Sequence, residues 1–338
     1  MIQLFNKVYV SVKNFIVENY KFLLVWAVII FLFFYELPFV IYTPGGIVDL
    51  ESRIEVSSAH ETSGSLNMSY VSLVKGTLPM VLLSYVIPNW DLVNKSEITA
   101  ADESVDELLE LERLYMQSSI DNATILAYQK ANKELKITRE VNNIIYISPD
   151  AKTDVLIYDE LLEVDGEVVE TVEELKKIVN SHKEGDELSI LVKRDGKEHN
   201  CSATVYSTTD GLKIGLSFLT TYEYETDPEI SVSTKSSESG SSGGLMLSLA
   251  IYNAISDNDI TKGRTIVGTG TIDIAGNVGA IDGVKYKILG AVKSDADIFL
   301  CPTENYEEAL KVKEEFDLDI TIHSVATFDE ALAYLSED

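Results

Sequence analysis

The pattern of hydrophobic and polar residues changes several times along the chain, and each change predicts a different kind of element. Near the N-terminus, residues 22–35 (FLLVWAVIIFLFFY) form an uncharged apolar run. Glu36 and Pro38 interrupt this run, and apolar residues then extend it to residue 42. Residues 22–42 together supply about 20 positions, the length that a membrane-spanning helix needs. We expect a single transmembrane anchor here.

The charges before this run predict its orientation. Residues 1–21 contain these charged side chains: Lys7, Lys13, Glu18 and Lys21. The excess of lysine places this end in the cytoplasm and the rest of the chain outside the cell membrane, by the positive-inside rule. A cleaved signal peptide is the main alternative. However, no small-x-small cleavage motif follows the run, and TPGG stands there instead.

Residues 43–135 show two further patterns. After TPGG, which predicts a turn, the runs RIEVSS and LNMSYVSLV alternate with the period of strands. From residue 101 the period becomes helical, with Leu108, Leu111 and Tyr115 on one face. We therefore expect a β-rich region beside the membrane, followed by a packing helix.

Residues 136–220 predict a compact unit of strand, hairpin, helix and hairpin. Both hairpins have an Asp-Gly turn, in LLEVDGEVVE and in LVKRDGKEH. Thr171 and Glu174 form a capping-box pattern at the start of the helix. This order resembles the circularly permuted PDZ domains of bacteria. One departure is Tyr158, where that family usually has glycine before the aspartate that is Asp159 here.

A PDZ domain binds an extended peptide as an added strand, which this resemblance implies here as well. The peptide groove would lie between the strand that carries Ile144, Ile145 and Tyr146 and the helix that carries Leu175. The alternative is that these apolar residues are simply core.

Composition and charge narrow the possible partners. The net charge of −28 argues against nucleic acid, whose binding needs basic surface. The two cysteines have neither CxxC spacing nor a histidine cluster beside them, so we expect no metal site and no cofactor. No GxxxxGK[ST] sequence is present, so we expect no ATP site of the P-loop type.

Residues 225–338 alternate between strand and helix patterns, which predicts an α/β domain. Inside it, the Ser/Gly run at residues 239–244 stands between a strand and an apolar helix, so it is not a linker between domains. Ser242 would lie at the helix N-terminus, where free N–H groups favour an oxyanion beside a nucleophilic oxygen. A plain N-cap is the alternative role for such a serine.

A serine nucleophile needs a base. None of the histidines stands in a supporting motif: His60, His182, His199 and His323. Lysine is the other base used with serine, and it must be desolvated to act near neutral pH. Lys285 and Lys287 lie in the first turn of a predicted helix, and helical spacing alone does not choose between them.

Two motifs resemble those of Lon-type serine proteases. Residues 240–246 (GSSGGLM) are similar to the Gly-Pro-Ser-Ala-Gly nucleophile motif of that family. Residues 269–287 are similar to its second motif, which ends in Lys-x-Lys with the second lysine catalytic. The resemblance implies that Ser242 is the nucleophile, that Lys287 is the general base and that Thr269 supports the lysine.

Three departures from the family pattern leave choices open. Ser241 stands where the family usually has proline, which puts two hydroxyls side by side, and the register favours Ser242. Gly243 stands where it usually has alanine, and Asp282 replaces the first residue of a Gly pair. Lys285 therefore remains the rival base. The N–H groups of Ser242 and its neighbours would form the oxyanion hole.

As a whole, residues 22–338 resemble the membrane-anchored, PDZ-containing Lon-like proteases of Gram-positive bacteria. The fold class is a multidomain α/β and β-rich chain: a transmembrane helix, a permuted PDZ-like domain and a C-terminal α+β proteolytic domain. The expected divisions are 1–21 cytoplasmic, 22–42 transmembrane, 43–135 membrane-proximal, 136–220 PDZ-like and 225–338 proteolytic.

The resemblance implies an ATP-independent serine endopeptidase that cleaves secreted peptides or unfolded proteins outside the cytoplasm. The PDZ-like domain would bind peptide or control access to the protease. An oligomer is possible. The alternative function is a non-catalytic, membrane-tethered PDZ scaffold that binds peptides.

Overall fold

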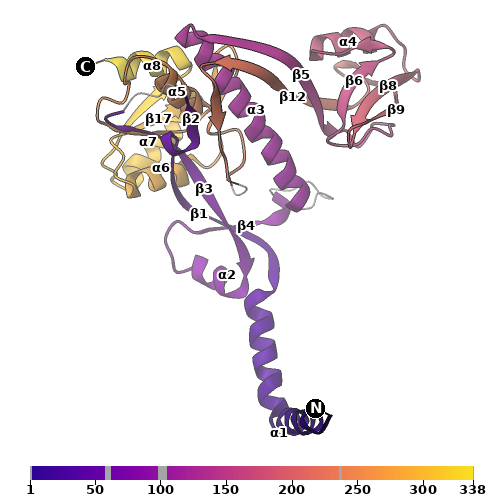
Figure 1. The fold of residues 1–338 in the computed structure, drawn as a ribbon, viewed down its shortest axis with the longest axis vertical. Coiled ribbons are helices and arrows are strands. Elements are labelled where there is room, and N and C mark those ends of the chain that lie inside the picture. Colours follow the sequence, from indigo (N-terminus) through magenta and orange to yellow (C-terminus); the bar gives the residue numbers. More distant parts are fainter. Residues whose placement is uncertain (1, 58–61, 98–104, 236–237, 338) are drawn as a thin grey trace.

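The computed structural model describes residues 2–57, 62–97, 105–235 and 238–337. Helix α1 (Ile2–Phe34) projects from one end of the molecule (Figure 1). At the other end lie two α/β bodies, one that contains α5–α8 and one that contains α4. This multidomain α/β architecture confirms the fold class that the sequence predicts.

Helix α1 ends at Phe34, before the end of the predicted span at residue 42. The residues from Glu36 onward form strand β1 (Glu36–Asp49) instead. Pro38 explains the break, because proline lacks an N–H group and disfavours helical backbone in the residue before it. Among the described residues, Lys7–Phe34 is the one helical segment long and apolar enough to cross a membrane.

A six-stranded mixed sheet forms the centre of the larger body, in the order β18-β17-β14-β3-β1-β4. The strands β3, β14, β17 and β18 are parallel, whereas β1 pairs antiparallel with β3 and β4. Besides β1, the strand bounds are β3 (Ser65–Thr77), β4 (Asp91–Asn94), β14 (Thr265–Gly268), β17 (Ile298–Pro302) and β18 (Thr321–Val325).

Helices cover both faces of this sheet. Ile266 of β14 packs into a core with α3, α5 and α8, whereas the next residue, Val267, packs into a second core with α6 and α7. Neighbouring residues of a strand point to opposite faces, which explains this division. The helix bounds are α2 (Leu78–Ser84), α3 (Val105–Ala131), α5 (Gly244–Ile255), α6 (Val284–Lys293), α7 (Tyr306–Glu315) and α8 (Phe328–Ser336).

Strands β1 and β3 belong to the sheet of the larger body, although the sequence pattern predicts residues 43–135 as a region separate from residues 225–338. The Asn67 side chain on β3 donates a hydrogen bond to the Ile266 carbonyl, 199 positions further along the chain. Helix α3 packs against α5 in the same core. Pairing over such a distance leaves no local pattern in the sequence.

The TPGG sequence does not form a turn between elements, contrary to expectation. It lies within β1, at an irregularity in the pairing with β3. A Cβ atom on Gly45 would lie 1.9 Å from the Tyr70 carbonyl oxygen, and one on Gly290 of α6 would lie 3.1 Å from the Gly45 carbonyl carbon. The glycines therefore allow α6 to approach the sheet closely.

The PDZ-like body contains a sheet in the order β12-β5-β6-β8-β9, with β7 beside β6. Helix α4 (Val172–Asn180) packs on its core, which includes Leu175, Ile178 and Val179. The strand bounds are β5 (Glu134–Ile147), β6 (Glu160–Val164), β7 (Glu167–Val168), β8 (Glu187–Arg194), β9 (Lys197–Thr204) and β12 (Leu216–Asp227). The predicted order of strand, hairpin, helix and hairpin is confirmed.

Short elements complete the chain. The remaining strands are β2 (Ile54–Val56), β10 (Tyr206–Thr208), β11 (Gly211–Lys213), β13 (Ile230–Val232), β15 (Thr271–Ile272) and β16 (Val278–Gly279). The 3-10 helices are η1 (Glu51–Arg53), η2 (Lys95–Glu97) and η3 (Thr303–Asn305).

Local signals in the PDZ-like body behave as the sequence predicts. The Thr171 hydroxyl accepts a hydrogen bond from the Glu174 N–H, and the Glu174 carboxylate accepts one from the Thr171 N–H. Tyr158 adopts a φ of 73°, the left-handed conformation that glycine would adopt without strain. The Asp159 carboxylate that follows is buried and accepts two hydrogen bonds from Arg194.

We predict that Thr171→Ala lowers the free energy of opening of α4 by about 1 kcal/mol, because it removes one half of the capping box. Native-state hydrogen exchange of the α4 amides measures this. Thr171→Ser should retain the protection. Thr209→Ala, in an exposed turn of the same body, serves as the matched control. Equal protection in Thr171→Ala and Thr209→Ala would contradict the prediction.

Candidate active site

The Ser/Gly loop lies at the start of α5 and is held by α3. The Gly240 N–H donates to the Glu112 carbonyl over 2.9 Å, and the Ser119 hydroxyl donates to the Ser241 carbonyl over 3.2 Å. Gly240 has a φ of 90°, which explains why glycine stands there. The loop is therefore fixed between two helices and does not act as a linker.

The glycines after Ser242 differ in the room around them. A Cβ atom on Gly244 would lie 2.8 Å from both the Ile272 side chain and the Ser119 hydroxyl. A Cβ atom on Gly243 would meet the Met68 sulfur atom at 2.7 Å. Because Met68 has a flexible side chain, the alanine that is usual in Lon proteases at Gly243 needs only a small adjustment of Met68.

Backbone N–H groups around Ser242 suit the binding of an oxyanion. The Gly244 N–H donates to the Ser241 carbonyl, and the Leu245 N–H donates to the Gly270 carbonyl. Within the residues that the structure describes, the N–H groups of Ser242 and Gly243 have no acceptor. They stand directly before α5, where the helix dipole favours negative charge.

Thr269 joins Lys287 to the main chain of Ser242. The Lys287 ammonium donates a hydrogen bond of 3.1 Å to the Thr269 hydroxyl, and that hydroxyl donates one of 3.0 Å to the Ser242 carbonyl. The Gly270 N–H donates to the same carbonyl over 2.8 Å. Thr269 is fully buried, directly after β14. The fold thus brings together three of the residues that the motifs single out.

Lys287 lies in a desolvated environment on α6. Its exposed fraction is 4%, and burial lowers its pKa to about 8, while the negative charge of Asp282 acts in the opposite direction. Burial also raises the pKa of the Cys301 thiol to about 12, so this neighbour stays protonated at neutral pH. A pKa near 8 leaves roughly a tenth of the Lys287 amines neutral at pH 7.

Lys285 has different surroundings. It is partly exposed and forms an ion pair of 2.8 Å with Asp91 of β4. The Tyr286 hydroxyl donates to the same carboxylate over 2.6 Å. Partial burial of Asp91 raises the pKa of its carboxyl. The hydrogen bonds from Lys285 and Tyr286 act more strongly in the other direction, so the pKa is lowered overall. Lys285 therefore belongs to the packing of α6 on β4.

The three histidines that the structure describes lie in other parts of the molecule than the Ser242 loop. His182 pairs with Asp165 in the PDZ-like body, His199 stands on β9, and the His323 ring stacks on Tyr334. Partial burial lowers the pKa of His323. His60 lies outside the described residues.

The sequence does not predict Ser119, Met68 and Cys301 as neighbours of the two Lon-like motifs. Ser119 comes from the helix before the PDZ-like body, Met68 from β3 and Cys301 from β17. None of them stands within a motif. The sequence predicts the elements that carry these residues from their apolar pattern. That pattern does not indicate which residues contact the Ser/Gly loop or Lys287.

The predicted PDZ groove needs a correction. Strand β5 pairs with β12 along its length. On its other side the Ile144 N–H donates to the Asp159 carbonyl, and the Ile144 carbonyl accepts from the Tyr158 N–H. A peptide therefore cannot add to β5 at Ile144, Ile145 and Tyr146. Ile144 is fully buried in the core with Leu175. Strand β12 is the edge of this sheet.

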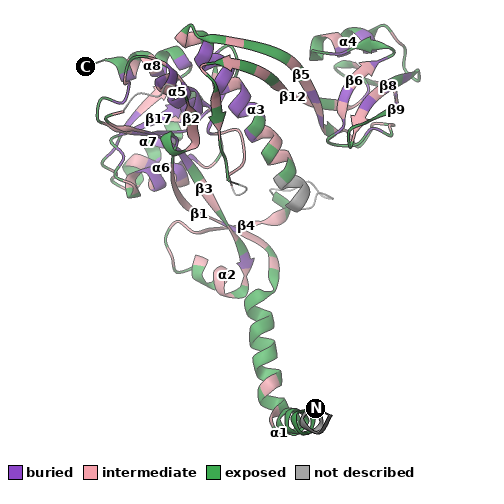
Figure 2. Ribbon diagram, viewed as in Figure 1, coloured by how far each residue is buried: buried purple, intermediate pink, exposed green. Residues whose placement is uncertain are grey.

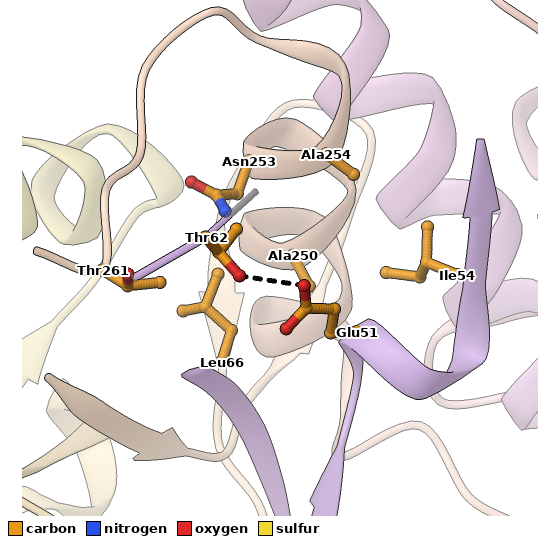
Figure 3. Close-up of a pocket in the computed structure, with 8 residues that line it drawn as sticks. All are labelled: Glu51, Ile54, Thr62, Leu66, Ala250, Asn253, Ala254 and Thr261. Carbon is orange, nitrogen blue, oxygen red and sulfur yellow. Dashed lines mark hydrogen bonds between the residues drawn. The ribbon is translucent and has the colours of Figure 1, made fainter. Parts of the chain in front are cut away.

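Two cavities lie apart from the Ser242 loop. One cavity, of about 50 Å³, lies between α5 and residues around β2. Figure 3 shows the residues that line it, among which the Thr62 hydroxyl donates a hydrogen bond to Glu51. The other lies between β5 and β7 in the PDZ-like body and is lined by Arg139 and Glu160 among others. Neither cavity includes a residue of the two Lon-like motifs.

Comparison with protein families agrees with the two motifs. Residues 138–205 match the PDZ domain family, and residues 228–337 match the family of the Lon protease (S16) C-terminal proteolytic domain. The chain therefore contains a PDZ domain followed by a Lon-type proteolytic domain, as its residues predict.

The similar curated proteins are Lon proteases. The Lon protease of Campylobacter jejuni is 36% identical over 96 residues, and that of Haemophilus influenzae is 29% identical over 99 residues. Lon protease 1 of Thermus thermophilus is 33% identical over 96 residues. These alignments cover 28% to 29% of this chain and 12% of the length of each relative.

Similar solved structures include PDZ domains from Listeria. The PDZ domain of an SdrC-like protein from Listeria monocytogenes has 20% identity and a TM-score of 0.23, and covers 25% of this chain and 93% of that one. A counterpart from Listeria innocua has 21% identity and a TM-score of 0.22, and covers 23% of this chain and 92% of that one.

We predict that Gly244→Ala destabilises α5 by about 1–3 kcal/mol, because its methyl group overlaps Ile272 and Ser119. Gly243→Ala should cost much less, because only the Met68 side chain must move. The measurement is the free energy of opening from hydrogen exchange of the α5 amides. If Gly243→Ala costs as much as Gly244→Ala, the described packing of the loop is wrong.

Proposed function

We propose that this chain is a membrane-anchored serine endopeptidase that works without ATP and uses Ser242 and Lys287. The observation that carries the proposal is the hydrogen-bonded path from the buried Lys287 amine through Thr269 to Ser242. This path lies in a domain that matches the Lon proteolytic domain.

In the proposed reaction, the neutral Lys287 amine takes the proton of the Ser242 hydroxyl while the serine oxygen attacks the peptide carbonyl. The N–H groups of Ser242 and Gly243 bind the oxyanion that forms. The protonated lysine then gives its proton to the leaving amine, and an acyl-enzyme remains. Water attacks this ester with Lys287 again as the base, and Ser242 is regenerated.

Burial and hydrogen bonding support Lys287 over Lys285 and Ser242 over Ser241 in this proposal. Lys287 is buried with a lowered pKa, whereas Lys285 is partly exposed and paired with Asp91, so Lys287 is the better base. Ser242 is preferred over Ser241 because its carbonyl is the one that Thr269 and Gly270 hold. Thr269 acts as a positioning residue.

The PDZ domain is proposed to bind an extended peptide at β12. The start of this strand is an open sheet edge, so its outer backbone groups can pair with an added strand, which is how such domains take up peptides. Further along β12, the Thr220 carbonyl and the Tyr222 N–H are already bonded to α3. Leu216 and Phe218 at the start of β12 pack partly against the core that includes α4. The peptide would therefore lie between β12 and α4.

The anchor supports an extracytoplasmic protease. Helix α1 has an apolar segment beside a lysine-containing N-terminal part, so the positive-inside rule places the PDZ and protease domains outside the cytoplasm. Secreted peptides and unfolded proteins are the proposed substrates. The sequence contains no GxxxxGK[ST] motif and the proposed reaction uses no nucleotide, so we expect cleavage without ATP.

We predict that Ser242→Ala abolishes cleavage of an unfolded protein and that Lys287→Met lowers kcat/KM by at least about 100-fold. The matched variants Ser241→Ala and Lys285→Met should retain most of the activity. The assay uses the full chain in vesicles, with and without ATP, and ATP should change nothing. Full activity in Ser242→Ala or Lys287→Met would disprove the dyad. Peptide binding without cleavage by the unmodified chain would instead favour a scaffold.

We predict that kcat/KM rises with pH through a midpoint of about 8, because only the deprotonated Lys287 can accept the serine proton. The rate should level off above this midpoint. The Asp282 charge raises the pKa of Lys287, so Asp282→Asn should move the midpoint to lower pH. A midpoint near the usual lysine pKa of about 10.4, or a flat profile, would exclude a desolvated lysine base.

A further inference from the structure

The loop between β3 and β4 presents an uncharged, apolar surface. Residues 76–90 (GTLPMVLLSYVIPNW) contain no charged side chain. They form α2 and the turn after it, and large apolar side chains are exposed there. These are Leu78, Leu82, Leu83, Tyr85 and Val86, with exposed fractions from 36% to 77%. Soluble surfaces rarely gather so many exposed apolar side chains in one short segment.

This surface is continuous with the membrane anchor. Helix α2 contacts α1, and Figure 1 places α2 beside the point where α1 meets β1. Figure 2 shows exposed residues along both helices at this junction. The strand partner of Glu36, just after α1, is Thr77, just before α2. The apolar surface thus begins at the level where the anchor ends.

The uncharged part of the anchor helix is shorter than the hydrocarbon core of a bilayer. This part, residues 22–34, rises about 20 Å at 1.5 Å per residue, whereas the hydrocarbon core is about 30 Å thick. Lys21 and Glu18 precede this part, and β1 follows it. In Figure 1, the N-terminal turns of α1 bend away from its straight portion. Further apolar surface at the outer end of α1 would reduce the mismatch.

We propose that α2 and the following turn, residues 78–90, lie in the outer boundary of the lipid bilayer as a second membrane contact. The occupant of this surface is lipid, in the zone between headgroups and acyl chains. Tyr85 and Trp90 match the aromatic residues that favour this zone. The inference rests on the membrane anchoring proposed above.

The charged residues on either side of residues 78–90 support a position at the outer boundary of the bilayer. Glu36 pairs with Lys75 over 2.6 Å and with Lys95 over 3.5 Å. These ion pairs stand on the two sides of the uncharged segment in the sequence, where the chain would leave the lipid for the headgroup region. A partner protein is less well supported, because the surface adjoins α1, which itself needs lipid.

A second membrane contact would fix the orientation of the protease. Strands β1, β3 and β4, which adjoin α1 and α2, belong to the same sheet as β14, the strand that Thr269 directly follows. With one contact the sheet can rotate about the anchor, and with two it is held at one tilt. The catalytic loop would then stay at a set height above the membrane.

The test uses tryptophan fluorescence of the full chain in phosphatidylcholine vesicles. The two native tryptophans are replaced by Trp26→Phe and Trp90→Phe. Single probes are then introduced as Leu82→Trp and Tyr85→Trp in the loop. Phe31→Trp reports on α1, and Leu156→Trp, which is exposed in the PDZ domain, is the matched control. Emission is compared between ordinary lipid and lipid brominated near the headgroup end of the acyl chains.

We expect the bromine atoms to remove most of the emission of Leu82→Trp and Tyr85→Trp, and to leave Leu156→Trp unchanged. If both loop probes stay unquenched while Phe31→Trp is quenched, the loop is outside the lipid and this inference fails, although the anchor stands. If Phe31→Trp is also unquenched, the membrane anchoring itself is wrong. Two loop probes guard against one substitution that disturbs folding.

Discussion

The burial of the Lys287 amine is the constraint on which the proposed catalytic arrangement depends. An exposed lysine would stay protonated at neutral pH and could not accept a proton. Lys287 avoids this because α6 packs onto the sheet beside the core around Val267 and Phe299. Thr269, directly after β14, supplies the one buried polar partner that the structure gives its amine. The same hydroxyl holds the Ser242 carbonyl, so one residue aligns both halves of the site.

Helix α3 connects this site to the PDZ domain. Its Ser119 hydroxyl bonds to the Ser/Gly loop, while Ser118 donates to the Thr220 carbonyl of β12 and Asp121 accepts from the Tyr222 N–H. Desolvation raises the pKa of Asp121, and its hydrogen bonds act in the opposite direction. The chain leaves the protease sheet through α3, passes through the PDZ domain and returns along β12. Peptide at the β12 edge would therefore act on a strand that α3 already holds.

Helix α1, the proposed anchor, and the proposed Ser242–Lys287 site are connected through one sheet. Strand β1 begins directly after the anchor and pairs with β3, and β3 pairs with β14, which leads to Thr269. Glycines in β1 let α6 lie close to this sheet. Helix α1 is therefore not a detachable segment, because its continuation β1 is an interior strand of the sheet that leads to Thr269.

Much of this protein was readable from the sequence, because short-range interactions carry the signals. Thr171 with Glu174 determined where a helix begins, Asp-Gly pairs determined two hairpins, and the serine and lysine motifs indicated a Lon-type domain. Lys285 and Lys287 were equivalent by spacing, and only the packing of α6 gave them different burial. The pairing of β3 with β14 and the edge position of β12 were also decided by tertiary structure. Burial and strand order depend on residues far apart in the chain, and no local pattern encodes which of them meet.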